Sequence, residues 1–221
     1  MTATGQVLAV LGLAGTGKSV AVGYLQRVYS VDPVYFGGVV IGEVERLGLP
    51  ITPDNERVVR EDLRRQEGMA VMARRSLPAI ESSLRSHGVA VVDGLYSGAE
   101  LDLLHGEYDA RLVTIAIHAD RSVREARLGA RVVRPLSPEE MRARDRAEVE
   151  ALDKARPIVL ASVQLTNNGT EAQLEAKLAR LVDRLRGGSA GDPDQDPAVQ
   201  AGHGELTAGA DGVSVELPRG R

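Results

Sequence analysis

The stretch GLAGTGKS, residues 12–19, decides the fold of this chain. It directly follows an apolar run at residues 7–11, which is typical of a parallel strand covered on both faces, and it opens a pattern of helical period. Glycines at such a turn let successive backbone N–H groups converge on phosphate oxygens, and the following helix adds its positive end. We therefore expect a phosphate-binding loop made by Gly12, Gly15, Thr16, Gly17, Lys18 and Ser19.

Two side chains carry the chemistry of this loop. Lys18 can reach the β- and γ-phosphates of a nucleoside triphosphate, and the hydroxyl of Ser19 can ligate Mg²⁺. The four fixed residues of this spacing coincide by chance in roughly a few chains per thousand. The sequence therefore predicts binding of ATP and Mg²⁺.

A second apolar run, residues 89–92, ends in Asp93. Ligands of doubly wound sheets lie outside the carboxyl ends of the strands, so Asp93 is expected to face the nucleotide phosphates. There it would join Ser19 in holding the metal, or accept a proton from the phosphoryl acceptor. The alternative interpretation is an Asp-Gly turn that only ends a strand.

Short apolar runs alternate with longer stretches of helical period along the first 186 residues. A third strand is expected at residues 112–117. This alternation predicts an α/β domain with a doubly wound parallel sheet and helical insertions. Helices are expected at residues 55–68, 69–86, 121–131, 138–152 and 171–186.

Arginines crowd the segment that follows the third strand. Phosphoryl transfer spreads negative charge over the moving group, and cations on a closing flap can stabilise that charge while excluding water. The alternative is a solvated helix face with neighbouring glutamates as partners. We expect catalytic contacts from Arg127, Arg131 and Arg144, with Arg134 as a further candidate for touching phosphate.

The formal charge of -4 comes wholly from the last 35 residues. Residues 187–221 hold six acids and two bases together with eight Gly and three Pro, a composition typical of a disordered acidic tail. The neutral remainder excludes a broad basic surface for nucleic acid. We expect a nucleotide-binding domain at residues 1–186, and removal of residues 187–221 should leave nucleotide binding intact.

The composition excludes several other classes of site. Without Cys the chain has no disulfide, no thiolate nucleophile and no Cys-ligated zinc, and its four His are scattered singly. No apolar run approaches the length of about 18 residues that a membrane span needs, and the first residues lack the basic region of a signal peptide. The sequence predicts a cytoplasmic monomer or homodimer without a membrane partner.

Four segments resemble the dephospho-coenzyme A kinase-like group of P-loop nucleotide kinases and its uncharacterised AAA- and UPF-type relatives. The resemblance implies a three-layer P-loop NTPase fold, an acceptor-binding insertion at about residues 35–86 and a short lid at about residues 131–144. The four segments are residues 12–19, residues 48–68, residues 91–97, and a later run through Arg127, Arg131, Arg144-Asp145 and residues 167–170.

The resemblance also implies roles for single residues. Asn167 and Gly169 match a segment that lies near the adenine, although Ser162 stands where the family commonly has Asp. Arg60 and Arg64 lie on a helix that resembles the acceptor-binding one, where an Arg grips the substrate's phosphate. We carry over only a backbone role for the adenine segment.

One departure concerns the acceptor. Dephospho-coenzyme A kinases usually place an Asp just after the second strand, whereas residues 34–39 contain no carboxylate. Either Asp93 supplies the base, or the acceptor is an anionic phosphate that needs none. Tyr96 also replaces an Arg found in relatives.

These features predict an ATP- and Mg²⁺-dependent phosphotransferase with a small nucleotide-like acceptor, either dephospho-coenzyme A or a nucleoside monophosphate. The alternative is a regulatory ATPase, in which nucleotide occupancy orders the arginine-rich flap and a partner protein reads that state. Such a switch needs the same loop but no acceptor pocket.

Overall fold

The computed structural model describes residues 5–187, so the expected tail lies outside the described residues except for Gly187. Contacts between residues divide the chain into two units, and the first unit ends at Leu181. This first unit contains the sheet. Its elements in order are β1 (Gln6–Leu11), α1 (Lys18–Tyr29), β2 (Val34–Tyr35), α2 (Gly37–Arg46), α3 (Pro53–Glu67), α4 (Val71–His87), β3 (Val89–Asp93), α5 (Gly98–Tyr108), η1 (Asp109–Arg111), β4 (Leu112–His118), α6 (Arg121–Gly129), α7 (Pro138–Leu152), α8 (Ala155–Val159), β5 (Val163–Thr166) and the start of α9 (Glu171–Leu185).

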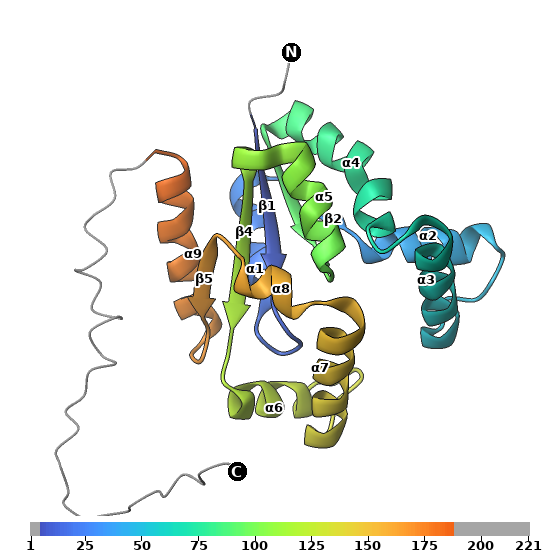
Figure 1. Ribbon diagram of the computed structural model, residues 1–221. Coiled ribbons are helices and arrows are strands. Elements are labelled where there is room, and N and C mark those ends of the chain that lie inside the picture. Colours follow the sequence, from blue (N-terminus) through green and yellow to red (C-terminus); the bar gives the residue numbers. More distant parts are fainter. Residues whose placement is uncertain (1–4, 188–221) are drawn as a thin grey trace, which may run out of the picture. The chain divides into compact units, whose positions relative to one another are not determined.

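Five strands of the described residues form a parallel sheet in the order β2-β3-β1-β4-β5 (Figure 1). In the centre, Val10 of β1 lies opposite Asp93 of β3 and opposite Ile115 of β4. The chain passes from β1 to strands on one side and later to strands on the other. The loop after β1 is therefore at the switch point of the sheet, where ligands of doubly wound folds bind.

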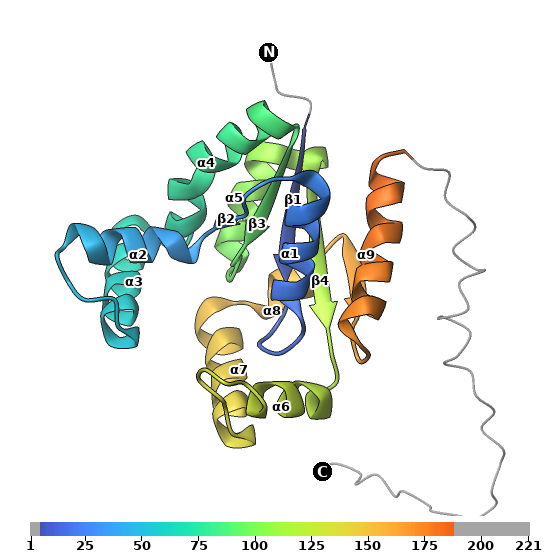
Figure 2. The ribbon, with the colours of Figure 1, turned by 180° about the vertical axis from the view of Figure 1, so that it is seen from behind.

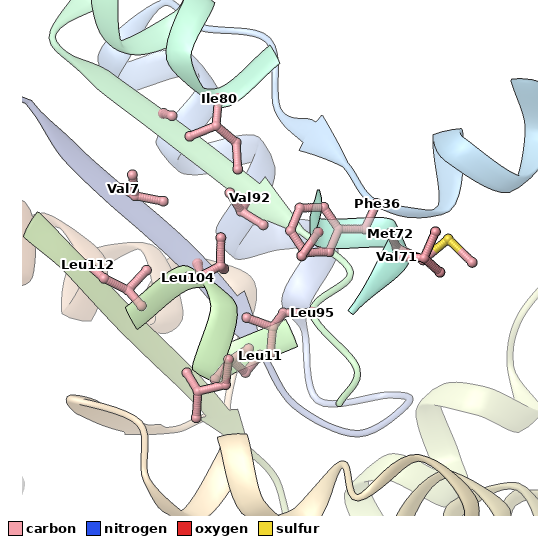
Figure 3. Packing of buried hydrophobic residues seen from close by; sticks show 14 of the residues in the cluster. Val7, Leu11, Phe36, Val71, Met72, Ile80, Val92, Leu95, Leu104 and Leu112 are labelled. Atoms are coloured by element: carbon pink, nitrogen blue, oxygen red, sulfur yellow. The ribbon is translucent and has the colours of Figure 1, made fainter. Parts of the chain in front are cut away.

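Helices cover both faces of this sheet. Figure 1 shows α5 in front of the strands, and the reverse view in Figure 2 shows α1 in front of them. The apolar layer on the α5 side includes Val7, Val92 and Leu104, and it continues to Phe36 and Met72 of the insertion (Figure 3). Because these insertion residues share the main core, the expected acceptor-binding helices are anchored to the sheet by apolar burial.

The expected doubly wound α/β architecture is confirmed, and the expected helices agree with the observed ones to within three residues at each end. Pro53 occupies the first turn of α3, and the hydroxyl of Thr52 accepts a hydrogen bond of 3.2 Å from the N–H of Asn55. Gly68 ends α3 with φ of +87°. The sequence did not reveal α2, α5, α8 and β5, which are short or lack a clear apolar period.

No helix among residues 5–187 is long and apolar enough to cross a membrane.

Candidate active site

The glycines of the loop after β1 adopt backbone conformations that other residues avoid. Gly12, Gly15 and Gly17 have φ of +141°, +81° and +103°. A Cβ on Gly17 would lie 2.4 Å from Nδ2 of Asn167, and one on Gly12 would lie 2.5 Å from the carbonyl oxygen of Ile117. The helix α1 begins at Lys18, and no side chain caps it. The first backbone N–H groups of a helix have no partner within the helix, so those of α1 can donate to a ligand held by the loop. This geometry fits a bound phosphate chain.

Lys18 lies partly buried at the first position of α1. Its Nζ donates a hydrogen bond of 3.0 Å to the carbonyl oxygen of Leu13. Burial lowers the pKa of Lys18 to about 8, with repulsion from Lys154 as the next cause, while Glu148 and Asp93 act in the opposite direction. The ammonium is therefore poorly compensated within the protein, and a phosphate oxygen would restore its preference for the charged form.

The two expected magnesium ligands lie on the elements that flank β1. Asp93 ends β3 beside Val10, and burial raises the pKa of its carboxyl, although Lys18 and Lys154 oppose that shift. Ser19 is exposed on the first turn of α1. A hydroxyl and a carboxylate fit Mg²⁺, which takes oxygen ligands and commonly binds through one or two side chains together with substrate phosphates.

Arg127 brings the expected adenine segment to the phosphate loop. Its guanidinium donates to the carbonyl oxygens of Asn167 at 2.9 Å and of Gly169 at 2.7 Å. The side-chain amide of Asn167 in turn donates to the carbonyl oxygen of Thr16 at 2.8 Å. Arg127 therefore joins two loops in this structure, and its donors face backbone oxygens.

Arg124 makes a second connection, which the sequence reasoning did not assign. Its side chain is 7% exposed, and Nε donates to the carbonyl oxygen of Ala14 at 2.7 Å. Its Nη2 donates to both carboxylate oxygens of Asp145, at 2.6 and 2.8 Å. The phosphate loop is thereby linked to α7, whose first half belongs to the expected lid.

A cavity of about 660 Å³ opens between α2, α3, α7 and the loop after β3. The structure brings Arg60, Arg64 and Arg144 together in its wall, although they come from distant parts of the chain. Tyr35 and Tyr96 contribute aromatic surface. We name this cavity the acceptor pocket. Arg131 does not line it; that residue is exposed in the connection between α6 and α7.

A chain of ionic contacts centred on the buried Glu148 and Lys154 joins α7 to the residue before α8. Oε1 of Glu148 accepts from Nε of Arg144 at 2.9 Å, and Oε2 accepts from Nζ of Lys154 at 2.5 Å. The Lys154 ammonium also lies 4.2 Å from the ring centroid of Tyr96. Sequence reasoning missed Lys154. Its rarity was the available signal, since it is one of three lysines among 27 basic residues.

Two buried polar atoms of the pocket wall have no hydrogen-bond partner, namely Nε of Arg64 and Oε1 of Glu100. The other oxygen of Glu100 accepts from the backbone N–H groups of Tyr96 at 2.7 Å and Ser97 at 3.0 Å. Burial lowers the pKa of Arg64 and raises the pKa of Glu100, and attraction between the two residues opposes both shifts. Glu100 thus caps α5 and partly compensates the charge of Arg64.

Sequence comparison places this chain among known relatives. A "UPF0200 protein" of Hyperthermus butylicus is 32% identical over 184 residues, which cover 82% of this chain and 95% of the relative. The chain belongs to the UPF0200 family. A "UPF0200/UPF0201 protein" of Archaeoglobus fulgidus is also 32% identical, over 182 residues, and the match spans 81% of this chain but only 56% of that longer relative. No family model matches the chain.

Solved structures similar to this UPF0200 chain include kinases. TT1252 from Thermus thermophilus has a TM-score of 0.56 at 21% identity, covering 85% of this chain and 99% of its own. A shikimate kinase from Bacteroides thetaiotaomicron has a TM-score of 0.51 at 14% identity, covering 82% and 98%. A gluconokinase from Sinorhizobium meliloti has a TM-score of 0.50 at 20% identity, covering 86% and 100%. These likenesses confirm the expected three-layer P-loop fold.

Proposed function

We propose that this UPF0200 chain is an ATP- and Mg²⁺-dependent phosphotransferase. The observation that carries the proposal is the adjacency of the phosphate loop and the acceptor pocket: Lys18 interacts electrostatically with Glu148 and Arg144, and both of these line the pocket. A donor nucleotide on the loop and an acceptor in the pocket would therefore meet near Lys18. Holding two reactants in this way supplies much of the acceleration of phosphoryl transfer.

Each element of the site has a defined task in this proposal. Backbone N–H groups from Gly15 to Ser19 hold the triphosphate, and Lys18 compensates charge on the transferring group. Ser19 and Asp93 hold Mg²⁺, which supplies further compensation of phosphate charge when bound. The adenine lies near Asn167 and Gly169, a segment fixed by Arg127.

The acceptor side of the site is built from arginines. Arg60 and Arg64 orient the acceptor, and Arg144 closes the pocket from α7. Arg131, exposed before α7, would reach the phosphates only if the lid moved. A cavity of about 660 Å³ suits a ligand of nucleotide size, such as a nucleoside monophosphate or the nucleotide end of dephospho-coenzyme A. We further propose that the protein acts in the cytoplasm as a monomer or homodimer.

An ATP-turnover assay with a panel of acceptors tests this proposal. Wild-type protein should transfer phosphate to at least one acceptor well above the rate of hydrolysis. Lys18→Ala should lower turnover by about 100-fold or more, because the transferring group loses its charge partner. Lys177→Ala, which alters a lysine on α9, is the matched control and should retain wild-type turnover. Full turnover in Lys18→Ala would show that the loop is not catalytic.

A regulatory ATPase remains the second candidate, and one observation favours it. Arg124 links the phosphate loop directly to α7 through Ala14 and Asp145, so nucleotide occupancy could alter the position of that helix. Slow ATP hydrolysis that no acceptor stimulates, combined with nucleotide-dependent protease protection of α7, would favour the switch over the kinase.

A further inference from the structure

The protonation state of the acceptor oxygen decides what the proposed reaction requires from the protein. A hydroxyl acceptor has to give its proton to a base within about 3 Å. An oxygen of a phosphate monoester is already ionised near neutral pH, since the second pKa of such a group is about 6. The position and pairing of carboxylates around the acceptor pocket therefore discriminate between the two classes of acceptor.

The edge of the sheet at β2 offers no carboxylate to the pocket. Tyr35 is the last residue of β2 and lies opposite Asp93 in the register, and Phe36 and Gly37 follow it in the pocket wall. Burial and the charge of Asp93 raise the pKa of Tyr35, which keeps this phenol protonated at neutral pH. Tyr35 can donate a hydrogen bond to a ligand, but it is a poor base.

Each of the three glutamates that line the pocket has at least one partner within the protein. Glu148 accepts from Arg144 and Lys154 with its two oxygens. Glu61 lies 3.6 Å from the guanidinium of Arg57 in a pair on α3. Glu100 caps α5 with one oxygen, and its other oxygen is buried in the wall without a hydrogen-bond partner.

Asp93 belongs to the phosphate-loop side of the site. It lies beside Val10 at the carboxyl end of β3, and it is not among the described residues that line the acceptor pocket, although Gly94 and Tyr96 are. In the proposed function its carboxylate holds the metal with Ser19. The pocket wall, as far as the structure describes it, then offers a hydroxyl no carboxylate that is both exposed and without a cationic partner.

The charge of the pocket favours an anion. Its wall contains four arginines and three glutamates. Arg57 is paired with Glu61 and Arg144 with Glu148, while Arg60 and Arg64 form no ion pair within the described part of the chain. The charges of Glu100 and Glu61 partly compensate that of Arg64. Two guanidinium groups in a partly buried pocket are a suitable site for a phosphate dianion.

We infer that the phosphoryl acceptor is a phosphate monoester of nucleotide size and that the product is a phosphoanhydride. This inference rests on the proposed function. A lone pair of the acceptor phosphate forms a bond to the γ-phosphorus of ATP, while the bond from that phosphorus to the β–γ bridging oxygen breaks. The bonding electron pair leaves with ADP, and no proton is transferred. Arg60 and Arg64 hold the acceptor phosphate in the pocket.

Product analysis tests the inference directly. Full-length protein with Mg²⁺ and ATP labelled on the γ-phosphate is incubated separately with AMP, CMP, GMP, UMP, adenosine and dephospho-coenzyme A. The expected result is label in at least one nucleoside diphosphate and none on a hydroxyl. Label on adenosine, or conversion of dephospho-coenzyme A to coenzyme A, would overturn the inference and leave the proposed kinase function standing.

The remaining outcomes are also decisive. ATP turnover without label on any of the four monophosphates overturns the inference. Absence of any Lys18-dependent ATP turnover overturns the proposed function and the inference with it.

A pair of neighbouring variants tests the role of the pocket arginines. Arg64→Met should raise the half-saturating concentration of the accepted monophosphate by about 10- to 100-fold and leave that of ATP within about twofold. Arg65→Met, which alters an exposed residue paired with Asp62, should change neither value. Arg60→Met provides a second variant in the same pocket wall if Arg64→Met fails to fold. Equal acceptor affinity in wild type, Arg64→Met and Arg60→Met would contradict the assignment.

Discussion

The ammonium of Lys154 donates a hydrogen bond of 2.5 Å to the carboxylate of Glu148, and the two residues are only 2% and 8% exposed. A buried ion pair of this kind is costly to desolvate, yet it is more costly to leave half of it in place. The pair fixes α7 to the start of α8 and presents Arg144 to the acceptor pocket. The α7 side of the pocket therefore depends on a residue that is not itself part of the pocket lining.

Loss of Lys154 should destabilise the protein strongly. We expect Lys154→Met to lower the free energy of unfolding by about 3–5 kcal/mol, because Glu148 would remain buried without its ammonium partner. Urea denaturation measures the change. Lys177→Met removes a half-buried lysine that donates to the carbonyl oxygen of Thr166, and it should cost less than about 1 kcal/mol. Equal stability of the two variants would show that the buried pair is not formed in solution.

Arg124 should contribute to both folding and nucleotide affinity. Its replacement by Ala leaves the carbonyl oxygen of Ala14 and the carboxylate of Asp145 without their donor, so we expect a loss of about 2–4 kcal/mol in unfolding free energy. The affinity for ATP should fall as well, because Ala14 belongs to the phosphate loop. Calorimetric titration and denaturation measure the two effects. Arg121→Ala, at an exposed position of the same helix, should change neither by more than about 0.5 kcal/mol.

The lowered pKa of Lys18 predicts unusual reactivity of its amine. A pKa of about 8, against an ordinary value of 10.5, means that half of the Lys18 side chains are neutral near pH 8. Acylation of Lys18 by an amine reagent should therefore rise with pH and reach half of its limiting rate near pH 8, and ATP should protect the residue. Mass spectrometry can follow Lys18 against Lys177 as an internal reference. A midpoint above pH 10 in the nucleotide-free protein would contradict this expectation.

The glycine at the end of the phosphate loop should tolerate no side chain. Gly17→Ala places a Cβ 2.4 Å from Nδ2 of Asn167 at φ of +103°, so we expect a loss of about 1–3 kcal/mol in stability and at least a tenfold loss of ATP affinity. Gly42→Ala is the matched control, because it lies inside α2 with no atom within 4 Å of the added Cβ. That control should stabilise the protein by up to about 1 kcal/mol. Wild-type ATP affinity in Gly17→Ala would contradict the assigned loop geometry.

Several elements were predictable from short, contiguous patterns. The central strands are continuous apolar runs, and α7 begins directly after Ser137, where a capping box with Glu140 and a proline in the first turn mark a helix start. By contrast, β5 has four half-exposed or exposed residues, so its sequence carries little of the apolar signal that marks a central strand. The helix α2 opens with two glycines and β-branched residues, which do not favour a helix by themselves; Val40 and Val44 stabilise it by burial in the core.

The sequence by itself determined the phosphate loop, because the required glycines, Lys18 and Ser19 are adjacent in the chain and act largely through local backbone conformation. Only the tertiary structure decided the partners of the charged side chains. Arg127 binds the carbonyl oxygen of Asn167, 40 residues away, and the ammonium of Lys154 lies over the ring of Tyr96, which is also distant in sequence. An arginine in a sequence pattern is equally suited to phosphate, carboxylate or carbonyl oxygen. The fold selects among these acceptors by burying some of them beside the guanidinium and leaving others in water.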